Sequence, residues 1–518
     1  MSRVGAQRRK WWVLGGVGIA SFLGTIDFTI VNTALAALRA DLGATVTELQ
    51  WLVSGFLLAL SACMVVMGRL ADLYGRRRVL FAGAVGFGLA SLGAGLATQV
   101  DMLIAFRLAQ GVACAVLYTA SGAIVADAFP EQERGRAIGW LFGINGLGLA
   151  LGPVLGGVLV GTLGWRSIFL LNVPLIALSL AICVPTLRES RDAQADRRID
   201  WPGVALLVVG LSTALLAIGQ GARWGWTSPA TLCAAGVAAV ALALFQRVEQ
   251  GAPAPLLKFA LFANRGFAGA ALANAALAFF YVLAFFLMPL YLSDVLGLAG
   301  WRLGLALLPT TATVALVSPL AGKLADRYGA RPVLLAGFAC FALSALLQTR
   351  FATDSGAALV AGAFACMGLG WACVLGPATV LALAAVPQRM AALAMGSSWT
   401  VHNVGGAVGL ALGLLCYELA AKARLLQVLA TQSVPSGPWV EQAVNDPGHA
   451  RALLLEHVGS AMSTARASAV FEQSFLAGFH AAMGLLAMVS LLVLVALALV
   501  LDRRASAAAT SAAAPRRP

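Results

Sequence analysis

The chain has 518 residues, of which 60% are hydrophobic and only 11% are charged, and its mean hydropathy is +0.88. Such a composition excludes an ordinary soluble domain and is typical of integral membrane proteins. The formal net charge of +13 would suit a nucleic-acid partner, but the distribution of the basic residues along the chain excludes that interpretation.

Long apolar stretches follow one another along almost the whole chain. A helix needs about 20 apolar residues to cross the hydrocarbon core of a bilayer, and about fourteen stretches meet this length. We therefore predict an all-α integral membrane protein. The predicted spans cover residues 12–36, 50–70, 79–98, 102–125, 136–161, 167–187, 202–220, 228–246, 265–293, 301–322, 332–349, 356–382, 389–418 and 476–501.

The basic residues indicate how these helices cross the membrane. With the N-terminus in the cytoplasm, about 25 of the 35 Lys and Arg residues fall on the cytoplasmic side. They cluster at 8–10 before the first span, at 76–78 after the second, and at 188–198 in the middle of the chain. This positive-inside bias predicts that both termini are cytoplasmic. The positive charge therefore reports membrane topology, and we expect no nucleic-acid partner.

One sixteen-residue segment occurs twice. Residues 68–83 read GRLADLYGRRRVLFAG and residues 322–337 read GKLADRYGARPVLLAG, so 11 of 16 positions match at an offset of 254 residues. Each copy lies in a short polar break between two apolar stretches. A membrane chain that repeats itself at this distance is most simply two similar helical bundles in one chain, which is a common architecture of transporters.

The offset also divides the chain. Adding 254 to the start of the first span leads to Arg265, where the ninth span begins. Six helices with their loops need about 190 residues, so the offset leaves room for two additional spans. We predict a six-helix bundle over 1–187, a charged loop with two additional helices over 188–264, and a second six-helix bundle over 265–501. The even number of spans between the copies makes the repeat parallel.

The ends of the chain and one long loop differ from this regular pattern. Residues 419–475 are predicted to form a long outer loop, polar at 431–448 and helical from Ala450 to Glu472, as either a surface subdomain or a membrane hairpin. Residues 502–518 are rich in Ala, Ser, Pro and Arg and are predicted to be a disordered cytoplasmic tail. The first span is too long for a signal sequence, so we expect it to be retained.

Several motifs occur in order on the predicted helices. The repeated loop contains Gly68-x-Leu-Ala-Asp72-x-x-Gly75-Arg76-Arg77, the fourth span Arg107-Leu-Ala-Gln110-Gly111, the fifth Gly152-Pro153-Val-Leu-Gly156-Gly157, and the first Asp27-Phe-Thr-Ile-Val-Asn32. With Trp165-Arg166 and Asn172-Val-Pro174, they resemble the major facilitator superfamily, in its branch of drug:proton antiporters with fourteen helices. The resemblance implies the major-facilitator fold, a bacterial inner-membrane location, and export of hydrophobic, often cationic, molecules in exchange for protons.

Asp27 and Arg107 are the charged residues placed deepest in the predicted spans. A carboxylate in the membrane is costly unless it is paired, faces a cavity or is protonated. Burial favours its protonated form and a nearby cation favours its charged form, so Asp27 could load and release protons. A carboxyl group that only hydrogen-bonds a neighbouring helix is the alternative. The resemblance implies that Arg107 takes part in proton coupling, and a structural tether between helices is the alternative.

The repeated loop is a candidate cytoplasmic gate. Its aspartate could pair with an arginine or cap the N-terminus of a neighbouring helix and so connect the bundles in one state. Topology alone is the alternative for the arginines. Ala330 and Pro332 replace two arginines in the second copy, which predicts a weaker second contact. The resemblance implies gating by Gly68, Asp72, Gly75, Arg76 and Arg77 in the first copy and by Asp326 and Arg331 in the second.

The glycine-rich fifth span matches the motif that the resemblance ties to export. It presents a flat or pliable face, which suits close packing against the other bundle, a kink, or simple helix packing. The motif residues are Gly148, Gly152, Pro153, Gly156 and Gly157.

A substrate cavity is expected between the bundles near the middle of the membrane. Aromatic faces there would suit hydrophobic cations, although any one of these rings could serve helix packing or face lipid. No second His or Cys accompanies His402 at ligand spacing, so we expect no metal. The predicted lining residues are Asn32, Trp51, Gln110, Tyr118, Asn145, Phe280, Tyr281, Trp399, His402 and Asn403.

These observations favour a proton-driven multidrug exporter whose partners are a small-molecule substrate, protons and the lipid bilayer. An exporter of one metabolite or antibiotic, and a transporter-like sensor that moves nothing, are the alternatives. The sequence contains no nucleotide-binding loop or catalytic motif, so we expect neither an enzyme nor a cofactor. Substrate identity, and whether a periplasmic adaptor protein is attached, stay open.

Overall fold

The structure is a computed structural model that describes residues 3–44, 46–190, 200–225, 227–251, 260–298, 301–431 and 464–501, together with 437, 439, 440 and 444. All regular elements in this part of the chain are helices. The predicted tail at 502–518 lies outside the described residues, as does most of 432–463.

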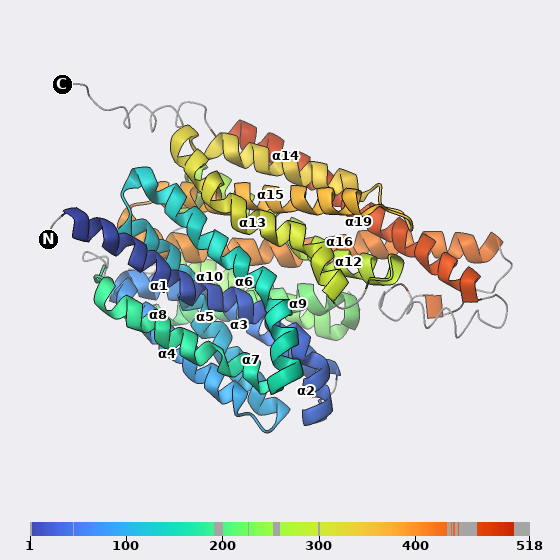
Figure 1. The fold of residues 1–518 in the computed structure, drawn as a ribbon, viewed down its shortest axis with the longest axis horizontal. Helices are drawn as coiled ribbons and strands as arrows, with labels where there is room; N and C mark the ends of the chain where they lie inside the picture. The colour runs from blue at the N-terminus through green and yellow to red at the C-terminus, as the bar shows by residue number, and fades with distance from the viewer. Residues whose placement is uncertain are drawn as a thin grey trace.

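The N-terminal half forms one group of helices, which Figure 1 shows in blue to teal. Small residues and continuous apolar sequence allow these helices to pack closely and to be apolar on all sides. The elements are α1 (Arg3–Ile30), η1 (Val31–Ala34), α2 (Leu35–Leu42), α3 (Val46–Tyr74), α4 (Arg76–Gly95), α5 (Val100–Ala128), η2 (Glu131–Glu133), α6 (Arg134–Leu163), α7 (Arg166–Leu170) and α8 (Asn172–Thr186).

The C-terminal half forms a second group, drawn in yellow to red, and two green helices lie between the groups in sequence (Figure 1). The green pair is α9 (Trp201–Trp224) and α10 (Pro229–Gly251). The second group contains α11 (Ala260–Ala263), α12 (Arg265–Leu290), the π-helix η3 (Tyr291–Val295), α13 (Trp301–Tyr328), α14 (Ala330–Gln348), α15 (Ala357–Ala384), η4 (Gln388–Met390), α16 (Ala391–Thr431) and α19 (Thr464–Val500).

The number of membrane-spanning helices agrees with the sequence. Thirteen helices in the described residues are long and apolar enough to cross a bilayer. A fourteenth is obtained if Glu131–Leu149 and Val154–Leu163, which meet at 44°, form one bent span. This bend lies in the glycine-rich fifth span, where a kink was one of the predicted explanations.

Two seams of small residues join the bundles. On α3 and α16, a Cβ at Gly68 would overlap the carbonyl oxygen of Ala392, and one at Gly396 would overlap that of Met64. On α6 and α13, a Cβ at Gly139 would overlap the carbonyl oxygen of Ser318. Each seam therefore pairs the second span of one bundle with the fifth span of the other.

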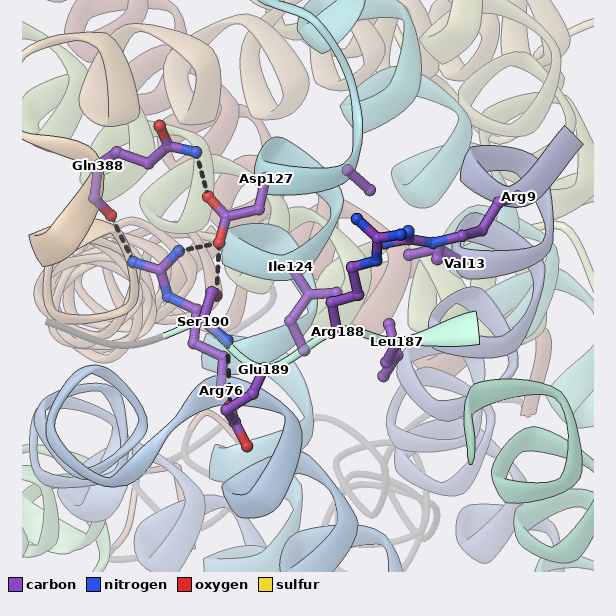
Figure 2. Close-up of a pocket in the computed structure, with 11 residues that line it drawn as sticks. Arg9, Val13, Arg76, Ile124, Asp127, Leu187, Arg188, Glu189, Ser190 and Gln388 are labelled. Atoms are coloured by element: carbon purple, nitrogen blue, oxygen red, sulfur yellow. Dashed lines mark hydrogen bonds and ion pairs between the residues drawn. The ribbon is translucent and has the colours of Figure 1, made fainter. Parts of the chain in front are cut away.

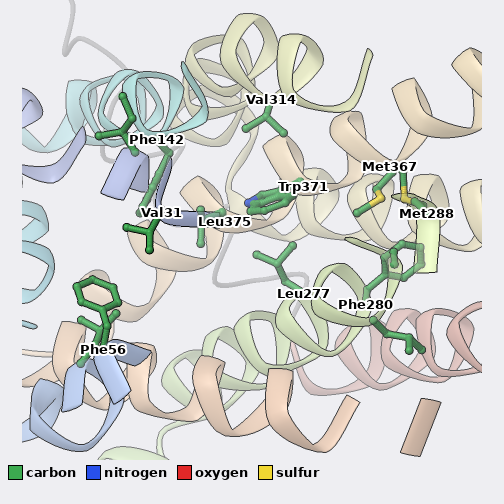
Figure 3. Close-up of a cluster of buried hydrophobic side chains, with 14 of the residues drawn as sticks. Val31, Phe56, Phe142, Leu277, Phe280, Met288, Val314, Met367, Trp371 and Leu375 are labelled. Atoms are coloured by element: carbon green, nitrogen blue, oxygen red, sulfur yellow. The ribbon is translucent and has the colours of Figure 1, made fainter. Parts of the chain in front are cut away.

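The two additional helices lie beside the α3–α16 seam. Leu207 and Leu211 of α9 are buried in an apolar cluster that also contains Val65 of α3 and Leu393 of α16. The larger apolar core extends through both bundles, and Figure 3 shows Phe142 of α6 close to residues of α15 at its centre.

The last two long helices extend beyond the predicted spans. Helix α16 has 41 residues and α19 has 37, and at about 1.5 Å per residue each is much longer than a bilayer core. The extensions pack against each other: the ring of Tyr417 meets that of Phe475, and the Ser474 hydroxyl donates to the Ala421 carbonyl (2.9 Å). The predicted span ends at 418 and 476 therefore do not coincide with the helix ends, because α16 continues to Thr431 and α19 begins at Thr464.

Candidate functional site

A buried ion pair connects the first and fourth spans. Nη1 of Arg107 on α5 donates to the Asp27 carboxylate on α1, and the side chains are 1% and 0% exposed. Nε of Arg107 donates to the carbonyl oxygen of Leu52 on α3 (3.1 Å). Because an isolated charge in this position would be costly, each residue compensates the other. The structure thus brings together two residues that the sequence singled out separately.

Neutral polar side chains complete the surroundings of this pair. Arg107 donates to Gln110 Oε1 (3.0 Å), and Gln110 donates to Ser91 on α4 (2.7 Å). Asn172 on α8 donates to the second oxygen of Asp27 (3.2 Å) and to Ser91 (3.3 Å). Ser91, Gln110 and Asn172 are all buried. Gln110 therefore belongs to this network and not to the predicted cavity lining, and Ser91 was not predicted because a lone serine in an apolar span carries no signal.

Aromatic rings hold the guanidinium in place. The Cζ atom of Arg107 lies 4.2 Å from the ring centre of Phe56 and 6.0 Å from that of Phe169. Like the hydrogen bonds to the Leu52 carbonyl and Gln110, these contacts do not depend on the charge of Asp27. The position of Arg107 is therefore held by contacts on three sides besides its ion pair with Asp27.

The Trp165–Asn172 motif also fixes the outer end of this bundle. Trp165 Nε1 (2.9 Å) and Arg166 Nη1 (2.8 Å) both donate to the carboxylate of Asp41 in α2. These hydrogen bonds, from Trp165 first and Arg166 second, hold the pKa of Asp41 below its ordinary value. The motif thus connects α2 to α7, while its polar residue Asn172 reaches the buried ion pair.

Asp72, in the first copy of the repeated loop, caps a helix of the other bundle. Its carboxylate accepts the backbone N–H groups of Ala392 (3.2 Å) and Leu393 (2.8 Å) in the first turn of α16. Such N–H groups have no partner within their own helix, and the helix dipole adds a favourable interaction with negative charge. The predicted helix cap is therefore present.

Arg76 connects this cap to two further residues. It donates to Asp72 (3.0 and 2.8 Å), to Asp127 at the end of α5 and to the backbone carbonyl of Gln388 in the second bundle. The Gln388 side chain donates to Asp127, and so does the Ser190 hydroxyl (2.7 Å). Figure 2 shows Arg76, Asp127, Ser190 and Gln388, which line a cavity of about 480 Å³. We call the contacts of Asp72, Arg76, Asp127 and Gln388 the first latch.

The second copy of the loop forms a simpler contact. Asp326 accepts the backbone N–H groups of Gly135 (2.7 Å) and Arg136 (2.8 Å) in the first turn of α6. Arg331 does not cross to the other bundle in the contacts recorded for it; it donates to the carbonyl oxygen of Ala498 on α19 (2.9 Å). We call the two Asp326 contacts the second latch. Both latches contain a helix cap. Among the described residues, only the first latch adds charged side chains, in the contacts of Arg76 with Asp72 and Asp127.

The remaining loop residues have local partners. Gly75 and Gly329 precede α4 and α14 with φ values of 111° and 83°, a region that favours glycine. Arg77 donates to the carbonyl oxygen of Val184 (3.0 Å), and the Glu189 carboxylate accepts the backbone N–H of Arg77 (3.1 Å). Arg77 therefore connects the loop to its own bundle.

The glycines of α6 face two different partners. Threonines at four-residue spacing on α1 and η1 lie opposite the motif glycines, so that a Cβ at Gly148, Gly152 or Gly156 would overlap the hydroxyl of Thr25, Thr29 or Thr33. The motif face thus packs within its own bundle. Contact with the other bundle comes from the preceding half of α6, at Gly135, Gly139 and Gly143.

The other two motif residues contribute less to this packing. Among the described residues, no atom lies within 4 Å of the place that a Cβ would take at Gly157. The side chain of Pro153 lies outside the described part of the chain. The close approach to α1 therefore depends on Gly148, Gly152 and Gly156.

The predicted cavity residues divide into two sets. The first set forms contacts at the interface between the bundles. Ring contacts there join Tyr118, Tyr281, Trp399 and His402. Asn403 on α16 donates to Met64 Sδ on α3 (3.4 Å). Phe280 instead packs on Phe341 inside the second bundle and is 2% exposed. Asn32 is exposed at the end of the first span and donates to its own helix. Helical position alone did not distinguish these faces, because residues next to each other in sequence point in different directions.

Three further residues complete the description of the predicted cavity. Asn145 on α6 is 5% exposed and its Oδ1 has no hydrogen-bond partner among the described residues, whereas Trp51 is half-buried in the first turns of α3. Trp371 on α15 was not predicted, although its ring stacks on Tyr281 with 4.3 Å between the ring centres.

Comparison with known proteins agrees with this architecture. The family model of the Major Facilitator Superfamily matches residues 17–410. The chain belongs to this superfamily. It is a transporter fold and not an enzyme.

Its relatives include several resistance proteins. The chain is 36% identical over 443 residues to "Multidrug resistance protein Stp" of Mycobacterium tuberculosis, covering 85% of this chain and 80% of that protein. It is 30% identical over 412 residues to "Tetracenomycin C resistance and export protein" of Streptomyces glaucescens, covering 79% and 77%. It is 33% identical over 413 residues to "Puromycin resistance protein pur8" of Streptomyces alboniger, covering 79% and 82%.

A solved structure supports the fold alone. The human organic anion transporter MFSD10 (TETRAN) superposes with a TM-score of 0.60 at 16% identity, over 94% of this chain and 99% of that one. The predicted major-facilitator fold is confirmed by the family match and this likeness.

Proposed function

We propose that this protein is a proton-coupled antiporter that exports hydrophobic small molecules by alternating access. The observation that carries the proposal is the buried Asp27–Arg107 pair. Together with Gln110, Ser91 and Asn172 it forms a network that joins α1, α4, α5 and α8 of one bundle. When Asp27 is charged it is paired with Arg107, and when it is protonated the guanidinium keeps its contacts with the Leu52 carbonyl, Gln110 and the Phe56 ring, so a proton can bind without displacing Arg107. The names of the relatives, which include two antibiotic resistance proteins and a multidrug resistance protein, support export of drugs and antibiotics.

The two latches support the alternating-access part of the proposal. Both connect one bundle to the first turn of a helix in the other, at the end of the molecule that contains the repeated loops. Positive-inside bias supports a cytoplasmic location for this end and for both termini, and the bacterial relatives support a bacterial plasma (inner) membrane. The conformation is then closed toward the cytoplasm, and opening it requires both aspartates to release their helices.

An exporter dedicated to one compound is a second candidate. It is favoured by relatives whose names each give a single antibiotic, such as tetracenomycin C and puromycin. The same proton-coupling residues would act in a multidrug exporter and in an exporter of one compound. Substitution of Asp27 therefore tests the mechanism in both cases.

The test is proton-driven transport by purified protein in liposomes. The probes are a panel of hydrophobic fluorescent compounds that includes ethidium and acridine, with an imposed pH gradient. We expect Asp27→Asn to abolish gradient-driven movement while leaving the protein folded in the membrane. Asp101→Asn, at an exposed position in the first turn of α5, is the matched control and should behave as wild type.

Gradient-driven transport by Asp27→Asn at the wild-type rate would contradict the assigned proton site. Absence of gradient-driven movement of every probe by the wild type would contradict proton-coupled multidrug export itself.

A further inference from the structure

A chain of aromatic rings crosses the interface between the two bundles, from α5 and α6 to α16. Resting on the proposed function, we propose that this chain is the substrate site and that it takes planar aromatic molecules without a fixed positive charge. We call it the ring array; it consists of Phe142, Tyr118, Trp399, His402, Tyr281 and Trp371.

Trp399 is the central ring of the array. Its ring centre lies 5.3 Å from that of Tyr118 on α5, 6.2 Å from that of Phe142 on α6, and 4.8 Å from that of His402 on its own helix. Tyr118 and Phe142 belong to the first bundle, whereas Trp399 belongs to the second. When the bundles move apart, these ring faces separate, and a flat aromatic molecule could take the place of the lost ring contact.

The array continues into the second bundle. His402 lies 5.6 Å from Tyr281, and Tyr281 stacks on Trp371 at 4.3 Å, measured between ring centres. Tyr118, Tyr281 and Trp399 are only partly buried, although they pack against the main core between the bundles. The rings available for contact with a ligand are therefore those of Tyr118, Tyr281 and Trp399, whereas Phe142, His402 and Trp371 are buried, as Phe280 is.

A neutral hydrogen-bond acceptor lies beside Phe142 on α6. Asn145 follows Phe142 by three residues on α6, so the two side chains are neighbours on the helix surface. Its Oδ1 is buried without a hydrogen-bond partner in the described part of the chain. An unpaired buried polar atom is costly, and a hydroxyl or amino group on the rim of an aromatic substrate would satisfy it.

The charges around the array do not favour a cation. Among the described residues, the hydrogen bonds recorded for the six rings join Tyr281 to His402 and His402 to the backbone of Asn274, and none goes to a carboxylate. Tyr118 packs against Gly24, one turn before Asp27 on α1. The carboxylate next to the array is therefore the one already paired with Arg107.

The ion pair determines the sign of the local charge in both protonation states. With Asp27 charged, the Asp27–Arg107 pair is neutral overall. With Asp27 protonated, Arg107 leaves one positive charge beside Tyr118, since an arginine stays protonated. Neither state offers net negative charge, so a fixed cation gains nothing from the pair and is repelled in the protonated state. This narrows the expected substrates from hydrophobic, often cationic, compounds to uncharged aromatic ones.

The test compares two probes with one ring system. Acridine is planar and uncharged at neutral pH, and N-methylacridinium has the same rings with a permanent positive charge. Binding to purified protein in detergent is measured by probe fluorescence, so the result does not depend on transport. We expect acridine to bind at least about fivefold more tightly than its N-methyl derivative. Tighter binding of N-methylacridinium, or no binding of acridine, would overturn the proposal.

Variants of Trp399 test the position of the site. Trp399→Leu should weaken acridine binding about tenfold, and Trp399→Phe should restore most of it, because a stacked ring adds to the affinity beyond the area that it buries. Trp201→Leu, at a residue that is 65% exposed on α9, is the matched control. Equal acridine binding by wild type and Trp399→Leu would place the site elsewhere.

A gain-of-function variant gives an independent readout. Asn145→Asp replaces an amide whose oxygen is unpaired by a carboxylate of the same shape, so it should reverse the preference and bind N-methylacridinium more tightly than acridine. An unchanged preference in a folded Asn145→Asp protein would show that the array does not bind the probe near α6 and would overturn the assignment. If binding behaves as expected while gradient-driven transport is absent, the proposed function fails and the substrate site stands.

Discussion

The two copies of the repeated loop make the same helix cap with different surroundings. Asp72 and Asp326 each accept two backbone N–H groups from the first turn of a helix in the opposite bundle. Around Asp72, however, Arg76 bridges to Asp127 and Gln388, whereas the arginine of the second copy, Arg331, bonds to a helix of its own bundle. The cap is therefore the part that the repeat preserves, and the charge network is an addition to one copy.

This difference predicts that the two seams are unequal. In the first latch, opening must separate Arg76 from a carbonyl group of the other bundle and Asp127 from the Gln388 side chain, in addition to releasing the cap. In the second latch only the cap has to break among the recorded contacts. We therefore expect the α3–α16 seam to control closure toward the cytoplasm more strongly than the α6–α13 seam.

Removing the carboxylate of the first latch should have the largest effect. Asp72→Ala eliminates the cap on α16 and one carboxylate partner of the buried Arg76, and breaking a buried pair costs about 3 kcal/mol or more. We expect gradient-driven transport to fall at least about tenfold. A cysteine introduced at Ser397, which is buried on α16, should also react faster with a maleimide added from the cytoplasmic side. Unchanged reactivity would show that Asp72 does not hold this seam closed.

The corresponding change in the second latch should be smaller. Asp326→Ala removes a helix cap without disturbing a recorded ion pair, and loss of a cap costs about 1–2 kcal/mol. Transport is expected to fall about fivefold, measured in the same liposomes as Asp72→Ala. An effect of Asp326→Ala equal to that of Asp72→Ala would contradict the proposed inequality of the seams.

Parts of this architecture follow directly from the sequence. The length and number of apolar stretches predicted the helices, the spacing of the repeat predicted the two bundles, and the aspartate of the repeated loop predicted either an arginine pair or a helix cap. Asp127 and Gln388 were not found, because their roles depend on the contact between the α5 end and the α15–α16 connection, which are far apart in sequence. No local pattern records such a contact.

The glycine-rich span shows a second limit. Its composition predicted close packing, but a sequence of glycines does not determine which neighbour they meet. The C-terminal half of α6 faces threonines of α1, and the N-terminal half faces α13. Assigning these faces requires the rotation of α6 about its own axis, which is determined by tertiary packing.

The contribution of the charge network can be separated from that of the cap. Gln388→Ala removes the side-chain donor to Asp127 and leaves both the Asp72 cap and the backbone carbonyl that Arg76 contacts. One hydrogen bond to a charged group contributes about 1.5 kcal/mol, and part of that loss is recovered by water at this exposed position, so transport should change by about threefold or less relative to wild type. Gln427→Ala, at a residue whose recorded partner is Arg424 on the α16 extension, is the matched control. A loss as large as that of Asp72→Ala would show that the network, and not the cap, holds the seam.

The smallest effect is expected at the arginine of the second copy. Arg331 donates to the carbonyl oxygen of Ala498, so Arg331→Gln removes a hydrogen bond within one bundle, with a cost of about 1 kcal/mol. The thermal unfolding temperature in detergent should fall slightly, while transport stays within about twofold of wild type. Arg76→Gln is the matched comparison, because it leaves Asp72 and Asp127 without their shared cation and should reduce transport strongly. Equal losses of transport in the two variants would mean that Arg331 acts as Arg76 does, although it occupies the position of Arg77 in the repeat, and the second copy would then need a partner across the seam that its present contacts do not provide.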